Sequence, residues 1–354
     1  SYIVSNLIDD ILNIDPDIIH IADLWFNAIS VIKSLMPERP VIGWLHSYAH
    51  VCYYVSTAIY YNYQNICSEC KLNRCILRHN TQNINIKNIR SILRAFATPF
   101  EYIYARNKMN QYKKSLLMAD ALIVPSNYAK EHTLRFIPEL APLIRVIPNP
   151  IPEELNYIQP EEHDGFTLIY MGGDDVSKGV LNLLKAIKMA ILKNPEIKLY
   201  MTKINDNSWV RQFIIYNKLQ NNVYTYPRLS IEELQKLFKQ VDALIAPSLW
   251  PETFLQVIIE ANLMGRIAIS TPIGAPREII VEGLNGFFVN SFNVNLLAHG
   301  ILNIAKIPKK YLWDMGHKAH DYVISKFNNE KIIEMYMNLY KNLMENNNII
   351  YRNT

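Results

Sequence analysis

Short apolar runs rich in β-branched residues alternate with helical patterns along most of this chain. This alternation is typical of βα units arranged around parallel sheets. Strands are expected at 17–22, 40–45, 120–124, 143–147, 167–171, 197–201, 222–226, 242–246, 266–270 and 286–289. Helices are expected between them, for example at 180–192, 231–240 and 254–264. The predicted fold class is therefore α/β.

One strand of the first half is nearly repeated in the second half. Residues 119–126 read ADALIVPS and residues 241–248 read VDALIAPS. A Pro-rich stretch beginning at Pro148 separates the halves and precedes a fresh strand. We expect two Rossmann-like domains, 1–150 and 151–328, with ligands bound at the carboxyl ends of their strands. An amphipathic helix and tail, 329–354, are expected to follow and to cross back to the first domain.

Composition excludes several classes of protein. The chain has 354 residues, 50% of them hydrophobic and 19% charged, which is a globular composition. No apolar run approaches the ~20 residues of a membrane span, and no signal-peptide pattern opens the sequence, so a cytoplasmic location is expected. A formal charge of +4 is too small to indicate nucleic-acid binding.

Two carboxylates eight residues apart stand out in the second half. Glu252 follows an expected strand in a loop bounded by prolines, and Glu260 lies within an apolar helical pattern. A buried charge is costly unless a partner hydrogen-bonds it, and ligand hydroxyl groups could supply that partner. The alternative is that Glu252 stabilises a helix dipole while Glu260 reaches solvent.

A glycine pair ends another expected strand of the second half. Gly172 and Gly173 would let a ligand approach the backbone closely, and Lys178 could contact a phosphate. The pattern matches neither a Walker A loop nor a GxGxxG fingerprint.

The order of these motifs resembles the family-4-type retaining glycosyltransferases of GT-B fold. The resemblance rests on Gly-x₅-Lys-Gly at 172–179, on Glu-x₇-Glu at 252–260, and on the segments TPIGAPRE at 271–278 and EGLNGF at 282–287. Segments of the first half agree, namely PDIIH at 16–20, VIGWLH at 41–46 and VIPNP at 146–150. The family fold would be GT-B, with the first domain on the acceptor side and the second binding a nucleotide sugar.

The resemblance assigns roles residue by residue. Lys178 matches the lysine that binds the donor diphosphate, Glu252 the carboxylate that holds the transferred hexose, and Glu260 the one that binds the ribose. Donor binding would also involve Gly172, Gly173 and the backbone N–H groups around Thr253, Phe254 and Leu255. His46 matches a histidine near the donor sugar, a positioning group more than a general base. His46 and Glu252 are the catalytic candidates.

The resemblance implies transfer of a hexose from a nucleotide-diphosphate sugar to a glycan, lipid-linked or small-molecule acceptor, with no metal required for the chemistry. Three departures from the family pattern keep alternatives open. Gly173 stands where the family commonly has arginine, Leu255 stands where it has glycine, and the family's first strand and Gly-rich loop do not precede the first matching segment. The alternatives are a nucleotide-sugar epimerase of the same fold and a catalytically inactive sugar-nucleotide-binding protein.

All four cysteines lie in one segment after His46. Cys67 and Cys70 have metal-ligand spacing, and Cys52 and Cys75 could complete a structural zinc site. Disulfides and free thiols are the alternatives.

A basic segment with interleaved aromatic residues, 87–114, follows the cysteines. Its cations outnumber its single carboxylate, Glu101: they are Lys87, Arg90, Arg94, Arg106, Lys108, Lys113 and Lys114. This pattern suits peripheral contact with an anionic membrane surface, on the cytoplasmic face, where a lipid-linked acceptor would be found. A solvated helix packed on its sheet is the alternative.

Overall fold

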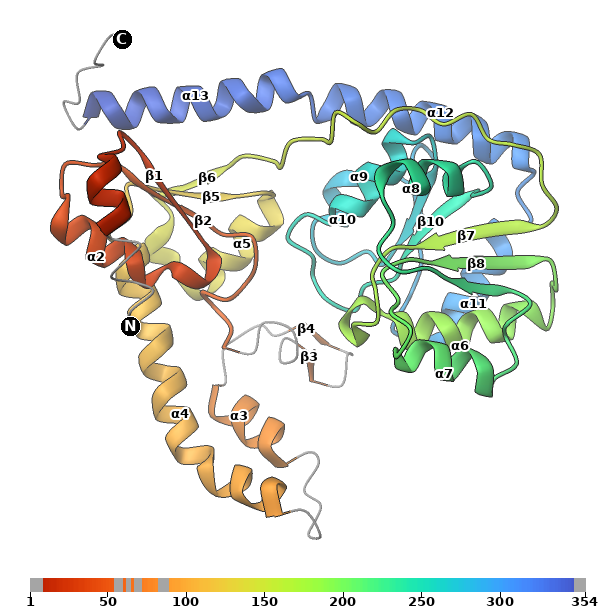
Figure 1. Cartoon of the computed structure of the whole chain (residues 1–354), viewed down its shortest axis with the longest axis horizontal. Coiled ribbons are helices and arrows are strands. Elements are labelled where there is room, and N and C mark those ends of the chain that lie inside the picture. Colours follow the sequence, from red (N-terminus) through yellow and green to blue (C-terminus); the bar gives the residue numbers. More distant parts are fainter. Residues whose placement is uncertain (1–8, 54–59, 62–64, 67–71, 82–88, 347–354) are drawn as a thin grey trace. The chain divides into compact units, whose positions relative to one another are not determined.

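The computed structural model describes residues 9–53, 60–61, 65–66, 72–81 and 89–346. By contacts, the chain divides into two compact units. The first unit comprises the described residues up to Pro148 together with those from Ile333 onward, and the second unit runs from Asn149 to Ile332. Each unit contains its own parallel sheet, as the alternating sequence pattern predicted (Figure 1).

The first unit contains a four-stranded parallel sheet in the order β1-β2-β5-β6. Its strands are β1 (Ile19–Ala22), β2 (Val41–Trp44), β5 (Ala121–Val124) and β6 (Ile144–Val146). The short helical elements joined to them are η1 (Asp23–Trp25), α2 (Asn27–Leu35), α5 (Asn127–Phe136) and η2 (Pro138–Leu140). All four residues of β5 are buried, which explains their continuous apolar run.

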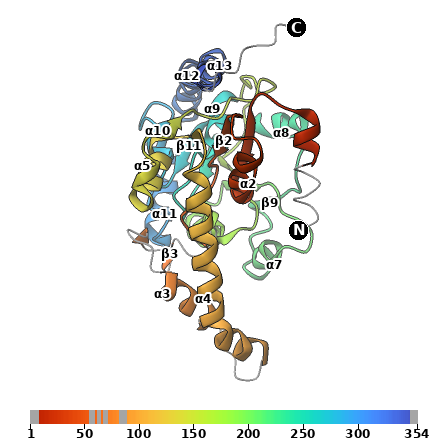
Figure 2. The same cartoon turned by 90° about the vertical axis from the view of Figure 1, so that its left-hand side faces the viewer.

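Helices α3 (Leu72–Thr81) and α4 (Ile89–Leu116) form an insertion between β2 and β5. They pack side by side, and α4 extends well beyond the sheet of its own unit (Figure 2). A short antiparallel pair, β3 (Tyr60–Tyr61) and β4 (Asn65–Ile66), precedes them. The C-terminal helix α13 (Asn329–Asn346) contacts the same sheet: the ring of Tyr340 lies edge-on to His20 of β1, with centroids 5.4 Å apart.

The second unit contains a six-stranded parallel sheet in the order β12-β11-β10-β7-β8-β9. Its strands are β7 (Phe166–Tyr170), β8 (Ile197–Met201), β9 (Val223–Thr225), β10 (Ala243–Ala246), β11 (Ile267–Ser270) and β12 (Gly286–Phe288). The central strands β7 and β10 are adjacent, with Leu168 opposite Ala243. The chain crosses from β9 back to β10, on the other side of β7, and this reversal leaves a crevice at the carboxyl ends of β7 and β10.

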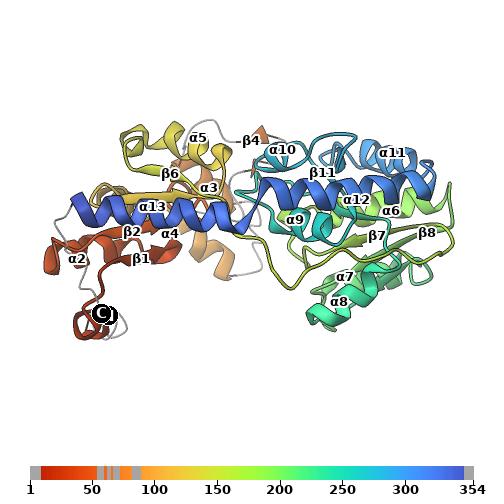
Figure 3. The same ribbon diagram turned by 90° about the horizontal axis from the view of Figure 1, so that it is seen from above.

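Helices cover both faces of this second sheet. In sequence they are η3 (Val176–Lys178), α6 (Val180–Ile191), α7 (Trp209–Tyr216), α8 (Ile231–Phe238), α9 (Gln256–Leu263), α10 (Pro276–Ile279), α11 (Val294–Ile304) and α12 (Lys309–Lys326). Helix α12 lies beside α9 (Figure 3), while α6 packs with α11 on the other face. Polar side chains begin several helices; Ser230, for instance, forms a capping box with Glu233 at the start of α8.

The expected strands, and the helices expected at 180–192, 231–240 and 254–264, lie within two residues of their observed bounds. The helix expected at 254–264 begins only at Gln256, because the backbone of Leu255 is left-handed, with φ 60° and ψ 63°. Among the described residues, no helix is both long and apolar enough to cross a membrane.

Candidate active site

The crevice of the second unit is lined by residues from the ends of β7 and β10, from the loops that follow these two strands and from the start of α9. These are Tyr170, Met171, Gly172, Lys178, Ile245, Ala246, Ser248, Glu252, Leu255 and Val257. Because parallel strands end at the same edge of a sheet, the two loops meet although they are far apart in sequence. Lys178 and Glu252, both predicted site residues, are brought together here.

Lys178 and Glu252 are bound directly to each other. The Lys178 ammonium donates to both carboxylate oxygens, at 2.7 Å to Oε1 and 3.0 Å to Oε2. The hydroxyl of Ser248 donates to the same Oε1 at 2.7 Å. Glu252 is buried, with 6% of its surface exposed, whereas the side chain of Lys178 is 33% exposed. The buried carboxylate predicted from sequence is therefore neutralised by a cation that remains open to solvent.

Lys178 is the last residue of a single 3₁₀ turn, η3, which precedes α6. Asp175 caps this turn by accepting from the N–H of Ser177 at 2.9 Å. Gly173, in the loop before it, has φ +71°, a conformation that favours glycine. Gly172 makes a close approach: a Cβ added there would lie 2.4 Å from the hydroxyl oxygen of Tyr170. Both members of the glycine pair thus meet a local steric requirement of the loop.

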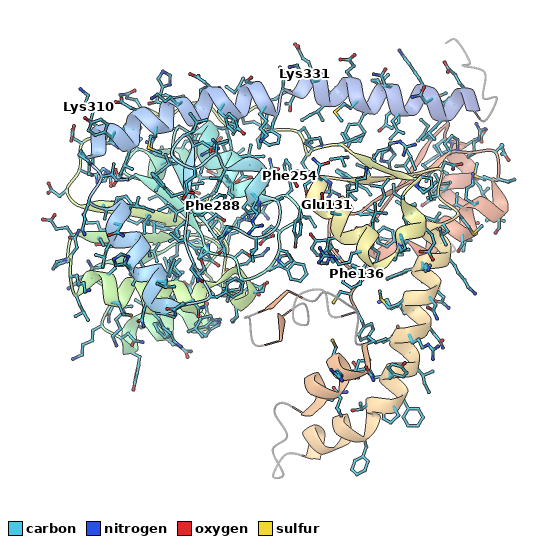
Figure 4. All side chains as sticks on the ribbon, turned by 180° about the vertical axis from the view of Figure 1, so that it is seen from behind. Glu131, Phe136, Phe254, Phe288, Lys310 and Lys331 are labelled. Carbon is cyan, nitrogen blue, oxygen red and sulfur yellow. The ribbon has the colours of Figure 1, made fainter. Side chains whose placement is uncertain are left out.

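The start of α9 forms another part of the lining. Thr253 and Phe254 precede Leu255, whose left-handed backbone explains why glycine would be favoured at this position. The ring of Phe254, labelled in Figure 4, is buried edge-on against Phe327 with centroids 5.6 Å apart. Only the backbone of Phe254, and not its side chain, is therefore suited to face a ligand. The first N–H groups of a helix have no partner within the helix, so they are suited to anionic or hydroxyl oxygens.

Glu260 lies about one turn into α9 and is only partly exposed. Burial raises the pKa of its carboxyl group above the usual value, and the nearby charge of Lys203 partly offsets this effect. Lys203 lies two residues beyond the end of β8 and has a left-handed backbone, with φ 62°. Glu260 therefore carries a desolvation cost that a hydrogen-bonding ligand would reduce.

His46 belongs to the first unit, two residues beyond the end of β2. Its backbone N–H and that of Ser47 donate to the Asp23 carboxylate at 3.0 and 3.2 Å. Its ring packs on Trp44, with centroids 3.7 Å apart. Burial lowers the pKa of His46 while Asp23 partly raises it, which favours a neutral imidazole at neutral pH.

The four-cysteine site falls partly outside the described residues. Cys67 and Cys70 lie there, while Cys52 and Cys75 are both partly exposed. Within the described ranges, no group of three or more His, Cys, Asp or Glu side chains is arranged to hold a metal ion. The structural zinc site stays a prediction.

Three site residues were not singled out from the sequence. Ser126 caps α5, whereas Ser248, its counterpart in the repeated segment, binds Glu252. Tyr170 had the pattern of a core strand residue, yet it lines the crevice. The carboxylate of Asp23 accepts a hydrogen bond from the backbone N–H of His46. Asp23 has an unusual backbone angle, φ +26°, which is visible only in the structure.

Comparison with known proteins gives matches along most of the chain. The family model "Glycosyltransferase Family 4" matches residues 3–155, and "Glycosyl transferases group 1" matches residues 153–321. The chain is 22% identical over 253 residues to the lipopolysaccharide 1,2-N-acetylglucosaminetransferase of Salmonella typhimurium, covering 66% of this chain and 65% of that enzyme. It is 26% identical over 188 residues to an uncharacterised protein in the cps region of Klebsiella pneumoniae, covering 52% of this chain and 48% of that one. The chain thus spans about half to two thirds of these relatives.

Solved structures share the fold at low identity. Sucrose-phosphate synthase from Thermosynechococcus elongatus superposes with a TM-score of 0.71 at 18% identity, covering 97% of this chain and 77% of that one. The Anabaena protein HepE in complex with UDP-glucose gives a TM-score of 0.65 at 18% identity, covering 95% and 82%. With two parallel-sheet units and two glycosyltransferase models that together run from residue 3 to residue 321, this chain belongs to the glycosyltransferases of GT-B fold.

Proposed function

We propose that this chain is a retaining glycosyltransferase that moves a hexose from a nucleotide-diphosphate sugar to a glycan or lipid-linked acceptor. The observation that carries this proposal is the buried carboxylate of Glu252, bound by Lys178 at the carboxyl ends of β7 and β10. A carboxylate suits sugar hydroxyl groups, and an adjacent ammonium suits a diphosphate.

Each site residue has a part in donor binding. Lys178 binds the diphosphate, assisted by the glycine loop before it and the first N–H groups of α9. Glu252 accepts hydrogen bonds from the hexose, and Glu260 accepts them from the ribose. The Lys178–Glu252 ion pair changes partners when the donor binds, because each member then faces a different part of the donor.

The chemical step is a displacement on one face of the sugar. The acceptor hydroxyl oxygen forms a bond to the anomeric carbon while the bond from that carbon to the diphosphate oxygen breaks. The acceptor proton passes to the departing diphosphate, whose charge Lys178 and the N-terminus of α9 stabilise. This route needs no divalent metal, and the neutral ring of His46 serves to position the sugar.

Relatives suggest which ligands to try first. HepE was solved with UDP-glucose, and the Salmonella relative is named for transfer of N-acetylglucosamine on lipopolysaccharide. UDP-sugars are therefore the first donors to test, and lipid-linked glycans the first acceptors.

A donor panel separates the proposed transferase from its two alternatives. The protein is incubated with UDP-glucose, UDP-N-acetylglucosamine, GDP-mannose or ADP-glucose, and the anomeric proton is followed by NMR. Slow release of the sugar supports a transferase, and conversion into another nucleotide sugar would instead identify an epimerase. Binding without any turnover would identify a sugar-nucleotide-binding protein.

We also propose that α4 contacts an anionic membrane surface, where a lipid-linked acceptor would be found. Its large apolar residues recur three or four positions apart on one helical face and are 57% to 76% exposed: Phe96, Phe100, Ile103 and Tyr104. Arg106 and Lys114 are exposed on the same helix and carry the charge that anionic lipid attracts.

Vesicle sedimentation tests the membrane contact. The protein should bind vesicles containing phosphatidylglycerol more than pure phosphatidylcholine, and replacing Phe96 and Phe100 by serine should release it. Serine at Leu192 and Tyr216, which are 80% and 88% exposed in the second unit, is the matched control. Equal binding by both double variants would contradict the proposal.

A further inference from the structure

The hydroxyl of Tyr170 is a buried polar group with no partner. Tyr170 ends β7, and its side chain is 1% exposed. Within the described part of the chain, its hydroxyl oxygen makes no hydrogen bond. Nearly all buried side-chain polar atoms have a partner, and one without a partner costs free energy. The unpaired hydroxyl of Tyr170 therefore needs a physical explanation.

The hydroxyl is directed toward the crevice. Its closeness to the Cα of Gly172 leaves no room for a Cβ there, and Tyr170 lines the same pocket as Lys178 and Glu252. A larger side chain at position 172 would displace the hydroxyl. The glycine thus preserves the position of Tyr170 as well as the shape of the loop.

The charges around the hydroxyl keep it protonated. Burial raises the pKa of Tyr170 well above 10, and the carboxylates of Asp175, Glu252 and Asp174 raise it further. The group therefore retains its proton and can donate a hydrogen bond to an acceptor oxygen. Diphosphate and sugar oxygens are such acceptors, and Lys178 and Glu252 are the side chains proposed to hold them.

We propose that the Tyr170 hydroxyl is a donor-binding group, which completes its hydrogen bond only when an oxygen of the nucleotide-diphosphate sugar occupies the crevice. This inference rests on the proposed function. The Tyr170 hydroxyl, at the end of β7, would then contact the donor together with Lys178 and Glu252. The free energy lost by leaving the hydroxyl unpaired in the free protein is regained when the donor binds.

Replacing Tyr170 by phenylalanine tests the proposal, because it removes only the hydroxyl. The free variant should unfold at the same or a higher urea concentration than the wild type. Its Kd for the nucleotide sugar that the wild type binds best among UDP-glucose, UDP-N-acetylglucosamine, GDP-mannose and ADP-glucose, measured by calorimetry, should rise about tenfold.

Tyr200→Phe is the matched control. Tyr200 is also buried, but its hydroxyl donates to Gln240 at 3.4 Å. This variant should lose stability and keep the wild-type Kd. An unchanged Kd in Tyr170→Phe, with or without a loss of stability, would overturn the inference. If the wild type bound none of these donors, the proposed function itself would fail, and the inference with it.

Discussion

The Lys178–Glu252 ion pair makes a quantitative prediction about stability. Removing one partner of a fully buried pair costs about 3–5 kcal/mol because the other charge stays buried. Here the lysine side chain is one-third exposed and Ser248 still donates to the carboxylate, so Lys178→Met should cost about 2–3 kcal/mol. Glu252→Gln leaves an ammonium that water can solvate, and it should cost about 1 kcal/mol.

A double-mutant cycle isolates the interaction. In Lys178→Met/Glu252→Gln neither charge remains, so the double variant should be about 2 kcal/mol more stable than the sum of the single effects predicts. Urea unfolding followed by tryptophan fluorescence gives the free energies, since Trp209, Trp250 and Trp313 lie in the second unit.

A surface pair of the same unit is the control for this cycle. Lys239 binds Glu161 at 2.9 Å, with both side chains about half exposed, so Lys239→Met should cost less than about 0.5 kcal/mol. A coupling of Lys178 with Glu252 below about 0.5 kcal/mol, or equal costs for the two lysine variants, would refute the reasoning.

Three further predictions concern single side chains and pH. Leu255→Gly should relieve the left-handed backbone strain and lower the KM for the donor, and a higher KM would contradict this. The free energy of unfolding should stay within about 1 kcal/mol of the wild type, because glycine also increases the entropy of the unfolded chain. Burial raises the pKa of Glu260, so the folded state holds its proton more tightly and loses stability as pH rises from about 4.5 through the folded pKa. Glu260→Gln should therefore be more stable than the wild type at pH 7 in urea unfolding, yet bind UDP more weakly, and unchanged UDP binding would exclude the ribose contact. Burial lowers the pKa of His50 to about 3 and that of His132 to about 4, so the folded state resists their protonation and stability falls as pH drops below about 6.5. Each histidine should lower the free energy of unfolding by about 2 kcal/mol between pH 7 and pH 5. His132→Phe should abolish the part of this loss that is due to His132, since phenylalanine can pack among the neighbouring aromatic rings. If the variant kept the wild-type dependence of stability on pH, His132 would not be the source of that loss.

The fold could be predicted largely from sequence because parallel strands buried on both faces leave continuous apolar runs. Residues 243–246 are such a run, and the structure shows β10 there with all four residues buried. The carboxyl-end rule then predicted where a ligand would bind, and the family resemblance assigned both Lys178 and Glu252 to the same donor. Their direct bond could not be predicted, since it depends on how two loops from distant parts of the chain orient their side chains.

Other features depend on local conformation that the pattern does not determine. The apolar period continues through Phe254, so it could not show that Leu255 would adopt a left-handed backbone and delay the helix. Strand alternation likewise marks Tyr170 as core but says nothing about where its hydroxyl points. Ser248 has the same sequence context as Ser126, which caps a helix, and only the tertiary structure shows that the Ser248 hydroxyl donates to Glu252.

The central claim is that the crevice holding Lys178 and Glu252 binds a nucleotide sugar for retaining transfer. The most direct test is the anomeric configuration of the sugar first released from an α-linked donor, followed by NMR before mutarotation, for the wild type and Glu252→Gln. We expect α-configured sugar from the wild type and at least about a hundredfold slower release from the variant, as for loss of a group that acts in the transition state. Release of the β-anomer first, or turnover by Glu252→Gln at the wild-type rate, would contradict it.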